Sequence, residues 1–144
     1  MTHVDALPAG DRQRPRLAAA GLADRCTVVE GDFFEAVPAG GDAYVLSHVI
    51  HDWDEARCRA ILANCRRAMG GRGRLLLVEA VLPPGDVPHP GKMLDLVMLT
   101  LTGGRERSEV EYAALLAAAG FTLTRVVPTA SQASVIEAVP SGSD

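Results

Sequence analysis

The apolar run at residues 75–81, LLLVEAV, constrains the fold more than any other segment of the chain. Such runs are typical of strands that are covered on both faces, and these occur mainly in the parallel sheets of α/β proteins. We therefore predict a central strand here. Further short segments with a strand-like pattern occur at residues 2–7, 25–30, 43–48, 122–127 and 134–139.

Helix-like patterns separate these strands. The first helix should begin at Pro15, because proline suits the first helical position, and should end at Gly21. After the strand at 43–48, Asp52 or Asp54 can cap a helix that runs to residue 69. Another helix is predicted at residues 92–101, after a proline-rich loop.

The C-terminal part should contain one more helix and a hairpin. Ser108 and Glu111 form a capping-box pattern that opens a helix through residue 119. The last two strands follow closely on each other, so we expect an antiparallel pair. Strands that alternate with helices before a hairpin indicate an α/β fold with a mostly parallel sheet. We expect one domain at residues 1–140 and a disordered tail at 141–144.

Composition narrows the function classes. The 144 residues are 48% hydrophobic and carry a net charge of −4, which suits a globular domain without a basic nucleic-acid surface. Three cysteines without CxxC spacing argue against a disulfide framework or a zinc site. We find neither a signal-peptide pattern nor an apolar run of the roughly 20 residues that span a bilayer. We therefore expect a cytoplasmic protein without membrane or nucleic-acid partners.

Acidic and basic residues cluster where strands should end. His51 and Asp52 follow the strand at 43–48, Asp32 follows the strand at 25–30, and Glu79 interrupts the central run. In open α/β sheets, ligands bind outside the carboxyl ends of the strands. A buried carboxylate needs a hydrogen-bond donor, and the ring of His51 is a natural one. This contact could be catalytic or merely structural.

Other kinds of site fit the sequence less well. His48 and His51 are three residues apart and would point to opposite faces of a strand, so we expect no metal. The glycine clusters do not stand between a strand and the following helix, which argues against a dinucleotide loop. Ser47 lies outside any GxSxG elbow, which argues against a serine nucleophile.

Five motifs follow one another along the chain: GDFF at 31–34, LSHVIHDWDE at 46–55, LLLVEAVLP at 75–83, MLDLVML at 93–99 and GGRERSEVEYAALLAAAGF at 103–121. In this order they resemble the catalytic region of S-adenosylmethionine-dependent small-molecule O-methyltransferases. The likeness is to the caffeate and flavonoid type and to actinobacterial relatives that tailor polyketides. It implies a Rossmann-like methyltransferase sheet, S-adenosylmethionine as cofactor, and methyl transfer to a hydroxyl of a small aromatic or polyketide-type acceptor.

The resemblance also implies roles for single residues. His51 matches the general base that takes the proton from the acceptor hydroxyl. Glu79 and Glu106 match two acids that flank this histidine and hold its orientation. Asp32 and Phe33 match residues that contact the adenine of the cofactor.

Further matches concern the cofactor and the acceptor pocket. Ser47 occupies a cofactor-contacting position that is often lysine in plant members. Asp5, in DALP, is a weaker match, because it lies one residue out of register with the family's ribose-binding acid. The stretch that lines the acceptor pocket is matched by Met93, Leu94, Met98 and Leu99.

Two parts of the family pattern have no match in the sequence: the N-terminal helical domain that mediates homodimerisation, and the first strand with its Gly-rich loop. The family's first strand lies between the second and the fourth, so its absence should leave unpaired backbone groups. We expect either completion of the sheet by another polypeptide or direct pairing of other strands. The alternative function is an inactive remnant or binding module of the same fold, or cofactor-dependent decarboxylation or hydroxylation.

If the sheet is incomplete, the isolated chain should unfold over a broad temperature range, because backbone groups at its centre lack partners. Circular dichroism measured during heating tests this expectation. A sharp, cooperative transition would contradict it.

Overall fold

The central strand is the longest in the protein. The computed structural model describes residues 2–5 and 10–142. In it, β4 (Arg74–Leu82) pairs in parallel with β3 (Ala43–Ser47) on one side and antiparallel with β7 (Ala133–Pro140) on the other. The apolar run therefore forms a strand, as predicted.

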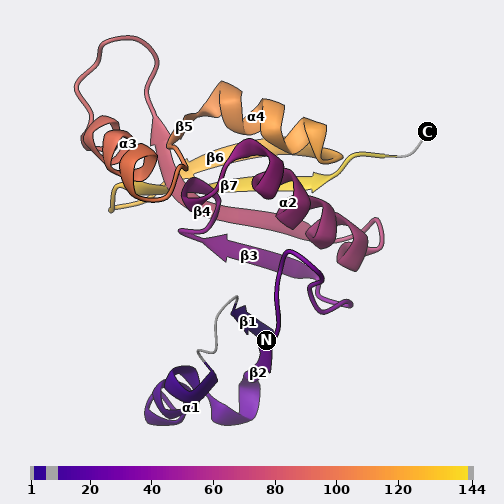
Figure 1. The fold of residues 1–144 in the computed structure, drawn as a ribbon. Coiled ribbons are helices and arrows are strands. Elements are labelled where there is room, and N and C mark those ends of the chain that lie inside the picture. The colour runs from indigo at the N-terminus through magenta and orange to yellow at the C-terminus, as the bar shows by residue number, and fades with distance from the viewer. Residues whose placement is uncertain (1, 6–9, 143–144) are drawn as a thin grey trace.

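The rest of the larger sheet follows from these pairings. Strand β6 (Phe121–Pro128) pairs antiparallel with β7, which confirms the predicted hairpin and gives the order β3-β4-β7-β6 (Figure 1). A two-residue strand, β5 (Arg107–Ser108), which the sequence did not indicate, pairs in parallel with the end of β4. The α/β fold class is thus confirmed, with parallel and antiparallel strands mixed in one sheet.

A second, smaller sheet lies beyond β3. It consists of β1 (Thr2–Asp5) and β2 (Thr27–Glu30), which pair in parallel, and it is accompanied by α1 (Gly10–Ala19) and a short 3₁₀ helix, η1 (Ala23–Arg25) (Figure 1). Within residues 2–5 and 10–142, neither of its strands pairs with β3. Direct pairing across the expected gap is therefore absent from the described part of the chain. Val45 of β3 is 58% exposed.

Helices α2 (Glu55–Met69) and α4 (Glu109–Ala118) lie side by side over one face of the larger sheet (Figure 1). Their apolar residues form the core together with Leu75 and Leu77 of β4. Leu76 and Val78 point to the other face and are only half-buried. Both helices pack on the same side of β4, so one face of this strand is buried and the other is covered only in part.

The start of the first helix differs from the prediction. Helix α1 begins at Gly10, so Pro15 lies inside it and not at its first position. Proline there removes one backbone hydrogen bond, but the five residues before it still take helical geometry. The third predicted helix is α3 (Pro90–Leu101), which begins two residues earlier than expected because His89 caps it. We find no helix in the described ranges that is long and apolar enough to cross a membrane.

The predicted tail begins at a residue that is held in place. The amide of Ser141 donates to the carbonyl of Gly120 at 2.9 Å, and its own carbonyl accepts from Arg66 at 3.2 Å. Residues 143 and 144 lie outside the described residues, so a disordered end beyond Ser141 stays a prediction.

Asp54, and not Asp52, caps α2: its Oδ1 accepts from the amide of Arg57 at 2.8 Å. We predict that Asp54→Ala lowers the free energy of unfolding by about 1 kcal/mol, because this amide loses its acceptor. Asp54→Asn is the matched control and should stay close to the wild type, since asparagine caps equally well. Urea denaturation measures both variants, and equal losses in the two would contradict the cap assignment.

Candidate active site

His51 lies in a tight turn directly after β3. The backbone leaves the strand through His48, whose φ of 54° is in the left-handed region, and enters the 3₁₀ helix η2 (Ile50–Asp52). Asparagine, aspartate and histidine tolerate this region better than most residues. His51 itself is 8% exposed. The turn therefore places a nearly buried imidazole at the carboxyl end of β3, where ligands bind in such sheets.

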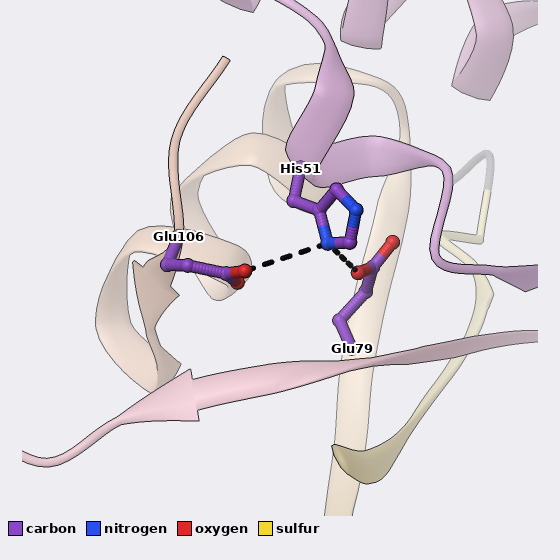
Figure 2. Close-up of side chains that lie close together, drawn as sticks. All are labelled: His51, Glu79 and Glu106. Carbon is purple, nitrogen blue, oxygen red and sulfur yellow. Dashed lines mark ion pairs between the residues drawn. The ribbon is translucent and has the colours of Figure 1, made fainter. Parts of the chain in front are cut away.

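Two glutamates face the same nitrogen of this imidazole. Nδ1 of His51 lies 2.9 Å from Oε2 of Glu79 and 3.5 Å from Oε1 of Glu106 (Figure 2). Glu79 comes from β4 and Glu106 from the segment just before β5. The structure thus brings together the three residues for which the sequence predicted a catalytic role.

Glu79 also holds the turn that carries His51. Its Oε1 accepts hydrogen bonds from the amides of Val49 at 2.9 Å and Ile50 at 2.8 Å. These two bonds, together with the ion pair between Oε2 and His51, explain how a carboxylate can lie fully buried inside an apolar strand, because a buried charge is tolerated when it is paired and hydrogen-bonded. The contact between His51 and Glu79 therefore has a structural part, whatever its part in catalysis.

Glu106 is held by its backbone and not by its side chain. Its amide donates to Oδ1 of Asp95, on α3, at 2.8 Å. Both side-chain oxygens are buried, and neither has a hydrogen-bond partner among the residues that the structure describes. Burial raises the pKa of Glu106 to about 7, against the charge of His51, which lowers it. This carboxyl group therefore exchanges its proton near neutral pH.

The two glutamates favour the charged form of His51. Its contact with the Glu79 carboxylate raises its pKa above 6.5, against burial, which lowers it, and the charges of Glu79 and Glu106 add to the rise. The other nitrogen, Nε2, lies 3.4 Å from Oδ1 of Asp52. In the neutral ring the two glutamates favour the proton on Nδ1, so Nε2, beside Asp52, is the nitrogen that takes up the second proton when the ring becomes charged.

The same three side chains could in principle hold a cation. One ligand atom from each of His51, Glu79 and Glu106 lies within 4.8 Å of the others. This set differs from the one weighed from the sequence, which joined His48 to His51. Oε1 of Glu79 is already occupied by two amides, which leaves Oε2, Nδ1 and the Glu106 carboxylate as the available atoms.

Asp32 and Phe33 lie in a turn after β2. Oδ1 of Asp32 accepts from the amide of Phe34 at 2.8 Å, so one carboxylate oxygen shapes the turn. Asn64 of α2 is buried and donates to the carbonyl of Phe33 at 2.8 Å. The Phe33 ring lies 6.3 Å from that of Trp53, two residues beyond His51. An exposed carboxylate and a half-buried aromatic ring thus lie on a fixed turn close to η2.

The other predicted cofactor residues are less well placed. Ser47 is exposed, and its hydroxyl lies 3.1 Å from Nδ1 of His48. Asp5 belongs to β1, opposite Glu30, but its side chain lies outside the described part of the structure.

The predicted acceptor residues all belong to α3. Met93 and Leu99 are 69% and 61% exposed, whereas Leu94 and Met98 are half-buried. Asp95, on the same helix, connects α3 to Glu106.

Three polar residues around the site were not predicted: Asp95, Asn64 and Arg107. The side chain of each forms a hydrogen bond with a backbone group of a predicted site residue or of its neighbour in the chain. Arg107 stands in the ERS motif directly after Glu106, and this adjacency was the one available signal.

Comparison with known proteins identifies the family of the chain. Residues 7–122 match the model of the O-methyltransferase domain family. The chain belongs to this family. It is 58% identical over 125 residues to the phenazine O-methyltransferase PhzM of Lysobacter antibioticus, an alignment that covers 87% of this chain and 37% of the relative.

Solved structures show the same relation. The crystal structure of LaPhzM superposes with a TM-score of 0.91 at 52% identity, covering 96% of this chain and 42% of that one. The structure of NcsB1 from neocarzinostatin biosynthesis, in complex with S-adenosylmethionine and 2-hydroxy-5-methyl naphthoic acid, superposes with a TM-score of 0.86 at 39% identity. This superposition covers 96% of this chain and 41% of NcsB1. The chain thus spans about two fifths of the length of these relatives.

The raised pKa of Glu106 predicts how stability depends on pH. The folded protein keeps a proton on Glu106 up to about pH 7, whereas an ordinary glutamate loses it near 4.5. The wild type should therefore lose stability as the pH rises from about 4.5 to about 7. Glu106→Gln removes this loss, so its free energy of unfolding should rise relative to the wild type across this window.

Chemical denaturation at pH 4.5, 6 and 7.5 measures this effect. Glu109→Gln, which removes an exposed acid three residues away, is the control for the loss of one carboxyl group from this segment, and the effect of Glu106→Gln is judged relative to it. A Glu106→Gln difference that stays constant with pH would contradict the assignment.

Proposed function

We propose that this chain is part of an S-adenosylmethionine-dependent O-methyltransferase that acts on a hydroxyl of a small aromatic or polyketide-type acceptor. The observation that carries the proposal is His51, whose Nδ1 lies between Glu79 and Glu106 while Nε2 contacts neither and lies 3.4 Å from Oδ1 of Asp52. The family supports the reaction class, and the names of PhzM and NcsB1 support aromatic acceptors. Met93, Leu94, Met98 and Leu99 of α3 would line the acceptor pocket.

The turn after β2 fits the cofactor. Asp32 uses one carboxylate oxygen within the turn and keeps the other for a polar group of the ligand. Phe33 offers an aromatic ring to a planar base, and Asn64 fixes the backbone beneath it. The cofactor supplies a methyl group on a positively charged sulfur, which makes the carbon electrophilic without a metal. We therefore assign no metal to the reaction.

His51 would act on the acceptor hydroxyl. Nε2 takes the hydroxyl proton, the oxygen forms a bond to the methyl carbon, and the bond from that carbon to sulfur breaks with its electron pair going to sulfur. A phenol has a pKa of about 10 and a free imidazole about 6.5, so this proton transfer is uphill in water. The two glutamates reduce the pKa difference between the acceptor hydroxyl and His51, because they raise the pKa of His51 and stabilise the imidazolium.

Orientation would contribute more than proton transfer. A positioned general base typically raises the reaction rate by about 10²–10⁴-fold. Effective molarities of aligned reactants reach about 10⁵–10⁸ M, which is the larger contribution. The nearly buried η2 turn suits this task, since Glu79 fixes both its backbone and its imidazole.

The remaining proposals concern location and partners. The acidic net charge of −4 argues against a nucleic-acid partner, and three free cysteines suit the reducing cytoplasm, where we place an enzyme that binds small molecules. Homodimerisation is the state that the family resemblance implies.

Calorimetry with S-adenosylmethionine and a methyl-transfer assay with a hydroxynaphthoate test the function. We predict that the chain binds the cofactor, and that His51→Ala abolishes transfer while the affinity for the cofactor stays nearly unchanged, because His51 acts on the acceptor. The control is His48→Asn, since asparagine tolerates the left-handed backbone at that position. It should keep the wild-type rate.

Each other outcome has a defined meaning. Lost cofactor binding in His51→Ala would contradict the role of the histidine. A wild type that does not bind the cofactor would favour an inactive remnant or binding module. Binding and turnover without methylation would favour decarboxylation or hydroxylation, and a rate that EDTA removes would contradict the metal-free reaction.

A further inference from the structure

Arg107 is a fully buried cation beside the candidate active site, and the proposed reaction does not use it. Its Nη1 donates to the carbonyls of Arg105 at 3.1 Å and Ile50 at 3.3 Å, and its Nη2 lies 3.6 Å from Sγ of Cys58. A buried guanidinium is costly unless it is well partnered. Here Nη1 and Nη2 are partnered by two backbone carbonyls and a thiol, whereas Nε has no hydrogen-bond partner among the described residues.

The contact with Ile50 matters because this residue directly precedes His51. The amide of Ile50 donates to Glu79, and its carbonyl accepts from Arg107 and, at 3.2 Å, from Sγ of Cys58. The peptide groups on either side of Ile50 are therefore fixed by a buried anion on β4 and a buried cation on β5. The direction in which the chain enters His51 depends on both.

A close backbone approach joins the same two segments. A Cβ atom added to Gly104 would lie 1.9 Å from the carbonyl oxygen of His51 and 2.6 Å from the carbonyl carbon of Asp52. Only glycine allows the segment before β5 to lie this close to η2. Glu106 stands between Gly104 and Arg107, so the segment that brings the second acid to His51 packs against η2 at Gly104 and is hydrogen-bonded to it at Arg107.

We infer that Arg107 is a positioning residue for His51: it ties the turn that carries the histidine to the segment that carries Glu106. Its significance for catalysis rests on the proposed function, but the contact it maintains is a property of the fold. Lysine at this position would keep the charge but lose the planar fork of donors, so it can replace arginine only in part.

The test follows the titration of His51 by NMR, with the ring signal assigned by its absence in His51→Ala. The charged or titratable groups around this ring are Glu79, Glu106, Asp52 and His48. In the wild type, the pKa of His51 should lie above 6.5. Arg107→Met should bring it down toward 6.5, because the released turn takes His51 away from the glutamates, and Arg107→Lys should fall between the two.

Arg105→Met is the matched control. Arg105 belongs to the same segment, but its side chain is 48% exposed and pairs with Glu55 and Glu111 at the surface. This variant should leave the titration of His51 unchanged. Thermal melting of each variant shows whether it is folded.

Every result decides the inference. A folded Arg107→Met with the wild-type pKa at His51 overturns it, even if the melting temperature drops, because the role of Arg107 is then merely structural. If Arg107→Met does not fold, Arg107→Lys decides: a lowered pKa of His51 supports the inference, and an unchanged one overturns it.

The kinetic readout separates this inference from the proposed function. In an active wild type, Arg107→Met should lower kcat by about 10²-fold, the cost of a small misplacement, and leave the dissociation constant of S-adenosylmethionine unchanged. If the wild type shows no methyl transfer, the proposed function fails, and the titration of His51 still decides the role of Arg107.

Discussion

The buried carboxylate of Glu79 is the interaction on which the site depends. It lies in the middle of an apolar strand. One of its oxygens accepts hydrogen bonds from two backbone amides, and the other faces the imidazole of His51. Loss of this carboxylate would leave the amides of Val49 and Ile50 without a hydrogen-bond acceptor and away from water. This costs more free energy of folding than the loss of a neutral contact. One charge therefore shapes the turn after β3 and orients the side chain that this turn presents.

Strand geometry explains why three distant segments meet there. Strands β3 and β4 run parallel, so both lead to the same edge of the sheet, and β5 begins there because it pairs with the last residues of β4. Val81 of β4 stands opposite Arg107 of β5, which places Glu106 one residue before this pair and near Glu79. The short strand β5, through its register with β4, thus decides where the second acid lies.

Local patterns predicted most of the fold, whereas contacts between distant segments were beyond them. The apolar run, the cap at Asp54 and the terminal hairpin each depend on neighbouring residues, and the structure contains all three. A strand of two residues has no periodicity, so β5 was missed, and Pro15 suggested a helix start that lies five residues too late.

The candidate site also contains residues that the sequence predicted and residues that it could not predict. The need of Glu79 for a donor predicted its contact with His51, and the family resemblance added Glu106. Sequence alone could not reveal that Asp95, Asn64 and Arg107 hold backbone groups, since each reaches across more than ten residues of chain. Their roles arise from packing, which single-residue patterns do not encode.

Under the proposed function, the bond from Asp95 to the amide of Glu106 has a consequence for any redesign of α3 toward new acceptors. The helix that carries the proposed acceptor residues also carries Asp95, which holds the backbone of the acid that lies 3.5 Å from Nδ1 of His51. A redesign that tilts α3 to admit a larger ring would shift Glu106 and so change the basicity of His51. Pocket shape and proton affinity are therefore not independent design variables in this fold, and a graft of α3 from another member should keep its aspartate in register.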